Sequence, residues 1–203
     1  MKIGLYYRVL IHNKQGKLVK RTHWKISKSF VLQFLQHVDF MINHAYGLAS
    51  TTVTIKDINA ASATMGVINS GSVWGSYYFG VFSADNDSAY GILCGTGTTA
   101  VTNADYKIET KIAHGVGAGQ FDYGAHSRTA AQVVGSNVDF VISRSFYNGS
   151  GGSITVNEIG IQCQSLDTSL AGHQFLLTRD VITPVAVANA QTLTVQYTLR
   201  TTA

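Results

Sequence analysis

The sequence predicts a mainly β protein: an antiparallel β-sandwich, jelly-roll-like in topology, with an N-terminal β-ribbon and one α-helix. Three observations predict this class. Short segments with alternating apolar and polar residues recur, glycine- and serine-rich stretches separate them, and the 203 residues include 20 Gly but only one Pro. Because one β domain absorbs most of this length, we expect residues 1–48 to form a ribbon-and-helix assembly arm and residues 49–203 the sandwich body.

The arm begins with an expected β-hairpin. Residues 1–11 are rich in Ile, Leu, Val and Tyr, and residues 13–16 supply turn chemistry before a second strand at 17–26. This hairpin is the ribbon, and it carries an unusual share of the basic residues.

A helix is expected over residues 30–45, with Ser27 or Ser29 as N-cap and Gly47 closing it. Seven apolar residues share one face at helical spacing: Phe30, Phe34, Leu35, Val38, Met41, Ile42 and Ala45. Five polar residues fall mainly elsewhere: Gln33, Gln36, His37, Asn43 and His44. Burying one large apolar side chain contributes about 1.5–3 kcal/mol, so we expect the helix to dock on its own domain or on a neighbouring subunit.

The body is expected to consist of a series of β-strands. Period-two segments lie at 52–58, 73–82, 90–94, 137–146, 153–162, 174–182 and 191–200. The clearest hairpin joins 138–146 to 154–161 through the glycine-rich turn at 148–152. Residues 95–136 are expected to be a long loop, with one short amphipathic piece at 106–112, and to contact a neighbour.

Charge is scarce and unevenly placed. Charged residues make up 13% of the chain, against about 25% in average soluble domains, so we expect neighbouring subunits to cover much of the surface. Residues 1–28 hold eight of the 15 basic residues and no acidic one, which leaves seven basic and all 11 acidic residues for the rest. The basic arm favours electrostatic attraction to the body of an adjacent copy; a solvated hairpin and contact with nucleic acid are the weaker alternatives.

These patterns give a set of candidate contact residues. The expected intersubunit contacts on the ribbon and helix are Arg8, Lys17, Lys20, Arg21, Trp24, Lys25, Phe30, Phe34, Leu35, Val38 and Met41. A second hypothesis, carbohydrate binding, rests on an aromatic cluster whose exposed part would be Trp74, Tyr77 and Tyr78.

Signatures of catalysis are missing from the sequence. It has no Gly-x-Ser-x-Gly elbow, no His-Glu-x-x-His and no Walker loop. His114, Asp122 and His126 could form a metal site or a base with its orienting group, but their spacing matches no rigid ligand pattern. Cys94 and Cys163 stand far apart in apolar runs and are expected to be buried thiols. We therefore expect no enzyme, no catalytic residue, no metal and no cofactor.

Two further expectations concern one ion pair and the location of the chain. Glu158 lies between apolar residues and could pair with Arg179 or Arg144. The first residues lack the apolar core of a signal peptide, and no run of 18 uncharged apolar residues occurs. We expect a soluble chain made in the cytoplasm, with no membrane partner.

Several sequence segments in the C-terminal half of the chain resemble bacteriophage structural proteins. They lie at 95–99 with 105–108, at 112–123, at 156–161 and at 176–187, within a region of about half the chain. The resemblance implies a non-enzymatic β-sandwich component of a virion, of the capsid, decoration or tail-appendage kind. Its partners would be copies of itself, as a homo-oligomer, and other virion proteins, and its location the virion after synthesis in the host cytoplasm. Carbohydrate binding by a tail appendage is the alternative.

Overall fold

The computed structural model describes residues 2–27, 29–43, 52–66 and 80–202, and this part of the chain is mainly β. Its strands and its one helix are β1 (Lys2–His12), β2 (Leu18–Arg21), β3 (Lys25–Ser27), α1 (Leu32–Asn43), β4 (Val53–Lys56), β5 (Ser62–Met65), β6 (Gly91–Gly95), β7 (Asp122–Val134), β8 (Asn137–Tyr147), β9 (Ile154–Leu166), β10 (Gly172–Val187) and β11 (Thr192–Thr202). The predicted fold class is confirmed at this level.

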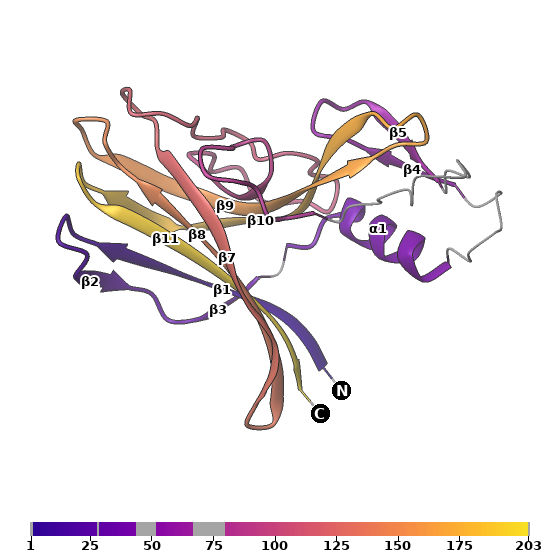
Figure 1. The fold of residues 1–203 in the computed structure, drawn as a ribbon, viewed down its shortest axis with the longest axis horizontal. Helices are drawn as coiled ribbons and strands as arrows, with labels where there is room; N and C mark the ends of the chain where they lie inside the picture. Colours follow the sequence, from indigo (N-terminus) through magenta and orange to yellow (C-terminus); the bar gives the residue numbers. More distant parts are fainter. Residues whose placement is uncertain (1, 28, 44–51, 67–79, 203) are drawn as a thin grey trace.

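The strands form three antiparallel sheets (Figure 1). The larger sheet has the order β2-β1-β11-β8-β7, and β3 also pairs with β1. A second sheet has the order β10-β9-β6, and β4 pairs with β5 in a small third sheet. None of these sheets closes on itself. The jelly-roll-like topology stays a prediction.

The expected N-terminal hairpin is present, and its first strand lies inside the larger sheet. Strand β1 pairs with β2 and β3 along one edge, and a turn with Gly16 at a φ of 74° joins β1 to β2. Along its other edge β1 pairs with β11, from Lys2 opposite Thr202 to His12 opposite Thr192. The two described ends of the chain therefore lie side by side (Figure 1).

The predicted hairpin between 138–146 and 154–161 is wrong. Both segments are strands, but β8 belongs to the larger sheet and β9 to the second. The glycine-rich turn carries the chain from one sheet to the other. Asn148, fully buried at the corner, donates from Nδ2 to the carbonyls of Gly152 and Val187, at 2.9 and 2.7 Å. These side-chain bonds satisfy the backbone where strand pairing stops.

Residues 95–136 are not one long loop. Strand β7 fills the last part and pairs with β8, with register shifts at Tyr123/His126 and Thr129/Gln132. Its outer half is exposed on both faces, so it lacks the alternation by which a half-buried strand is recognised. The expected amphipathic piece at 106–112 is confirmed: Ile108 and Ile112 are buried in the core, while the residues between them are exposed. Strand β5 was also not expected.

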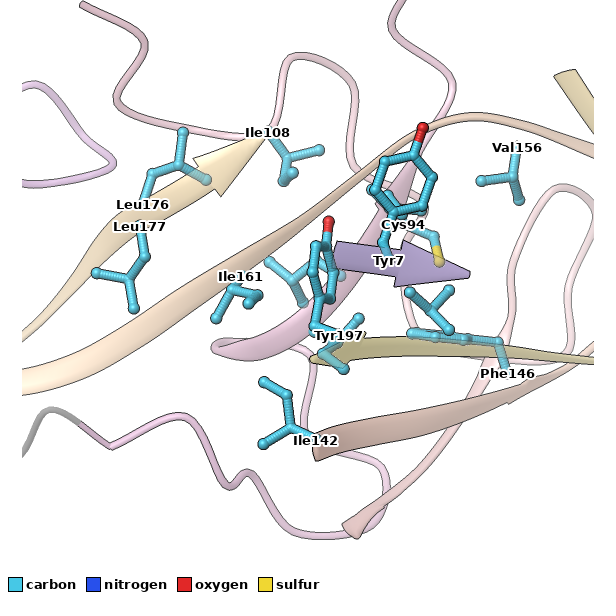
Figure 2. Packing of buried hydrophobic residues seen from close by; sticks show 14 of the residues in the cluster. Tyr7, Cys94, Ile108, Ile142, Phe146, Val156, Ile161, Leu176, Leu177 and Tyr197 are labelled. Atoms are coloured by element: carbon cyan, nitrogen blue, oxygen red, sulfur yellow. The ribbon is translucent and has the colours of Figure 1, made fainter. Parts of the chain in front are cut away.

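The core lies between the two main sheets (Figure 2). Tyr7, Ile142 and Tyr197 of the larger sheet belong to the same buried cluster as Ile161 and Leu177 of the second. The Tyr197 hydroxyl donates to Asp180 Oδ2 at 3.1 Å, which joins the sheets by a buried polar contact. Both cysteines are free and buried, as predicted.

Helix α1 presents a different face to the core from the one expected. Gln33 and His37 are buried, whereas Leu35, Met41 and Ile42 are more than half exposed. His37 Nδ1 lies 2.9 Å from the Gln33 carbonyl, and its ring meets Phe175 edge-on at 4.8 Å, while the buried Gln33 Oε1 has no hydrogen-bond partner among the described residues.

The start of α1 also differs from expectation. The Ser29 hydroxyl donates to Asp180 rather than capping the helix, and Phe30 forms a bridge with Thr178 of β10. The segment before the helix is thereby fixed to the second sheet. Among the described residues no helix has the length and apolar character needed to cross a membrane.

His173 fastens the small β4–β5 sheet to the β9–β10 turn. Its Nδ1 lies 3.1 Å from Asp57 Oδ2 and its Nε2 lies 3.1 Å from Asp167 Oδ2. Each carboxylate also accepts backbone N–H groups of its own turn, at Asn59 and Ala61 for Asp57. Burial alone would lower the pKa of His173, but the bonds to the two carboxylates outweigh it and raise that pKa.

We predict that this contact loses strength as the pH rises. A raised histidine pKa means that the folded state binds the proton more tightly, so the contribution is complete below the unfolded pKa of about 6.5 and disappears above the folded pKa. The difference in free energy of unfolding between the parent chain and His173→Ala should be larger at pH 6 than at pH 9, measured by urea unfolding. An equal difference at both pH values would refute the protonated contact.

Candidate functional site

The outward side of α1 exposes several large apolar side chains. Leu32, Leu35, Met41 and Ile42 are 55%, 62%, 54% and 75% exposed. Leu35 and Met41 were predicted as contact residues and are available for contact, while Val38 is half-buried. Leu32 and Ile42 were not in the predicted contact set, although both lie in the apolar helical run.

Phe30 and Phe34, also predicted to contact a neighbour, point into the molecule. Their rings stack at 4.0 Å between centroids, and both pack against the core. They line an apolar cavity of about 300 Å³ between the sheets, whose walls include Phe140 and Leu199. The cavity contains no charged side chain. Its chemistry suits an apolar group and gives no means of catalysis.

The predicted ribbon residues lie together at the β2 edge of the larger sheet. Lys17, Lys20, Arg21, Trp24 and Lys25 are exposed, and Arg8 is half-buried with its guanidinium 4.4 Å from the centre of the Trp24 ring. Within the described ranges, none of the basic side chains of the ribbon forms an ion pair.

A group of acidic residues is instead gathered around Arg179. Arg179 Nε donates to Glu158 at 2.7 Å, one terminal nitrogen to Asp105 at 2.9 Å, and the other to Glu109 at 2.7 Å. Both Arg179 and Glu158 are buried. The predicted pairing of Glu158 with Arg179 is confirmed, and Arg144 is not its partner.

Glu158 also organises the loop that follows β6. Its Oε1 accepts the N–H groups of Gly97 and Thr110, at 3.0 and 2.8 Å. A Cβ at Gly95 or Gly97 would come within 2.3 or 2.5 Å of that oxygen, so glycine is required at both positions. Gly95 and Gly97 therefore leave room for the carboxylate of Glu158, a group of the protein itself. Both carboxylate oxygens of Glu158 are therefore occupied by hydrogen bonds within the protein.

Arg144 is buried without a carboxylate partner and donates to main-chain carbonyls, including those of Gly124, Tyr90 and Ile92. Its guanidinium lies 4.8 Å from the Tyr123 ring centre. These carbonyls belong to β7 and to the segment before and within β6, so one side chain joins the two main sheets.

His126 and Ser83 resemble a base and a nucleophile, but their hydrogen bonds have the wrong direction. The Ile92 N–H donates to His126 Nε2 at 2.6 Å, which places the ring proton on Nδ1, 3.0 Å from Ser83 Oγ. The imidazole therefore cannot accept a proton from Ser83. Burial, followed by the charge of Arg144, lowers the pKa of His126 to about 4.

The other proposed chemistry is not assembled. His114 Nδ1 lies 3.8 Å from Asp122 Oδ1 and accepts the Tyr123 N–H. Across the described ranges, no three His, Cys, Asp or Glu side chains are grouped so that they could hold a metal. The proposed carbohydrate face, Trp74, Tyr77 and Tyr78, lies outside the described residues.

The tip of the β7–β8 hairpin is a surface that sequence reasoning missed. Val133, Val134 and Val138 are 76%, 44% and 41% exposed. The hairpin extends from the body beside the chain ends (Figure 1). A signal was present, since residues 129–138 contain no charge although they include a turn. No family model, curated protein or solved structure matches this chain.

We predict that Arg179→Ala lowers the free energy of unfolding by about 3–5 kcal/mol, because it leaves Glu158 buried without its cation. Arg200→Ala is the matched control, since Arg200 pairs with Asp139 but is about one-third exposed. Its expected cost is about 0–1 kcal/mol. Urea unfolding of both variants makes the measurement, and equal costs would show that the Arg179 cluster is not a buried constraint.

Proposed function

We propose that the chain is a non-enzymatic structural subunit that assembles with copies of itself into a symmetric oligomer or lattice. The observation that carries the proposal is the exposed face of α1, where four large apolar side chains stand more than half in solvent. Large exposed apolar side chains grouped on one element often belong to an interface, which here would also include Asp39, exposed at helical spacing between Leu35 and Ile42.

The occupant that we propose for this face is a second copy of the chain. The low charge content supports this choice, because a monomer that circulated alone would rely on surface charge to stay dispersed. The free edge of strand β7 also supports a second copy as the occupant. Residues 129–134 form an exposed, uncharged outer strand of the larger sheet, which is the kind of edge that pairs with another chain.

The particle that we propose is a virion, and the part is of the capsid, decoration or tail kind. The support is the resemblance of segments in the second half to bacteriophage structural proteins, together with the β-rich fold. We include in this proposal the finer architecture, a jelly-roll-like sandwich, which the shared core of the two main sheets supports.

We predict that the double variant Leu35→Asp/Ile42→Asp lowers the assembly state of the purified chain, because burying two carboxylates in an apolar interface is unfavourable. Size-exclusion chromatography with light scattering, and electron microscopy of the same sample, make the measurement. The parent chain should form discrete oligomers, rings, tubes or shells.

The matched control is Val116→Asp, because Val116 is also exposed, at 64%, but lies on a loop away from α1. It should assemble like the parent chain. Circular dichroism verifies that each variant is folded. A parent chain that stays monomeric at all concentrations, or a folded double variant with unchanged assembly, would overturn the proposal.

A further inference from the structure

The outer edge of the ribbon concentrates positive charge. Strand β2 is the last strand of the larger sheet on that side, and all four of its residues are exposed. Six basic residues with described surroundings gather on β1, β2 and β3 and in the turn before β2: Arg8, Lys14, Lys17, Lys20, Arg21 and Lys25. Burial, and then the nearby charge of Arg21, lower the pKa of Arg8, which indicates that the cations repel one another.

The cations border both faces of this edge. Lys20 is opposite the buried Ile11, and Lys25 is opposite the buried Tyr7, so these two lysines share the inner face of the sheet. Arg21 is opposite Leu10 and lies on the other face, the same side as Arg8. Charge therefore surrounds the strand edge.

A recess at the inner side has room for a small oxyanion. It measures about 140 Å³; its walls are mainly apolar, from Tyr7, Val9, Ile182, Pro184 and Val185, and its polar lining is Lys20, Thr22, Lys25 and Thr183. Lys25 Nζ already donates to the Thr183 hydroxyl at 3.2 Å, so the lysine is held at the recess. Ammonium and hydroxyl donors of this kind match the oxygens of a phosphate group.

Most acidic residues have a cation of the same chain beside them. All 11 are described, and six of them lie beside such a cation: Asp105, Glu109 and Glu158 beside Arg179, Asp139 beside Arg200, and Asp57 and Asp167 beside His173. These contacts do not cancel the net acidity, because residues 29–203 hold seven basic and 11 acidic residues. The arm of one copy can therefore still attract the body of the next, and within the described ranges the ribbon cations have no ion pair that would compete with an external anion.

The nature of the edge favours nucleic acid over an anionic membrane. A membrane-binding element separates an apolar face from a charged one. Here Leu18 and Arg21 lie on the same face, so apolar and cationic side chains are mixed. Trp24, 40% exposed and next to Arg8, adds an aromatic ring of the type on which bases stack.

We propose that the β2 edge of the ribbon binds the sugar-phosphate backbone of nucleic acid without regard to sequence, with Lys20 and Lys25 holding a phosphate at the recess. This inference does not depend on self-assembly. It assigns to the ribbon a ligand outside the protein, beside the contact with a neighbouring copy that its sequence favours.

The test is fluorescence anisotropy of a labelled oligonucleotide of about 20 nucleotides, single-stranded or duplex, with the full chain in about 50–200 mM salt. Affinity should fall as salt rises. The variant Lys20→Glu/Arg21→Glu/Lys25→Glu should bind at least about tenfold more weakly and, for the duplex, lose about three from the slope of log affinity against log salt.

The matched control is Lys56→Glu/Lys107→Glu/Arg128→Glu, which changes the net charge equally at three exposed body positions. It should keep most of the affinity, and circular dichroism verifies the fold of both variants. Equal losses in the two variants, no salt-dependent binding by the parent chain, or binding to phosphatidylserine vesicles with none to either oligonucleotide would overturn the proposal. Light scattering on the same samples reports assembly separately, so failure of one proposal is distinguishable from failure of the other.

Discussion

The pairing of β1 with β11 is the constraint on which the rest of the structure depends. It joins residues at opposite ends of the described chain, and it places β1 between the ribbon strands and the body. Closing so long a loop costs chain entropy, which the shared core repays through Tyr7 and Tyr197 and the side chains packed around them. Because β1 is held in this way, the basic edge strand β2 is presented on a fixed sheet.

The buried charges have the second largest influence on the architecture. Arg179 fixes the loop after β6 through three carboxylates, and Arg144 ties β7 to the segment around β6 through main-chain carbonyls. Burying charges is costly even when they are paired or hydrogen-bonded, so we expect their value to lie in selecting one arrangement of irregular segments. Arg179 engages three of the 11 carboxylates of the chain, and the ribbon cations form no ion pair within the described ranges.

Local patterns predicted the local structure well. The strands at 137–146, 174–182 and 191–200 were found because they alternate against a core, and the Glu158–Arg179 pair was found because both lie in apolar runs. Which strands pair with which could not be predicted from the sequence, because nothing near residue 148 distinguishes a hairpin turn from a connection between two sheets. The face of α1 was misread because His37 is buried through contacts with Gln33 and Phe175, which are tertiary features. Phe30 and Phe34, two of the predicted contact residues, pack against the core instead, again because of tertiary contacts that the sequence does not show.

The central place of β11 has a consequence for synthesis. This strand leaves the ribosome after every other described strand, yet β1 and β8 both need it as a hydrogen-bonding neighbour. Until then, each of those two strands has an unsatisfied edge, in a chain with few charges to keep it dispersed. The larger sheet can therefore be completed only late, so we expect the nascent chain to be most prone to association before β11 takes its place.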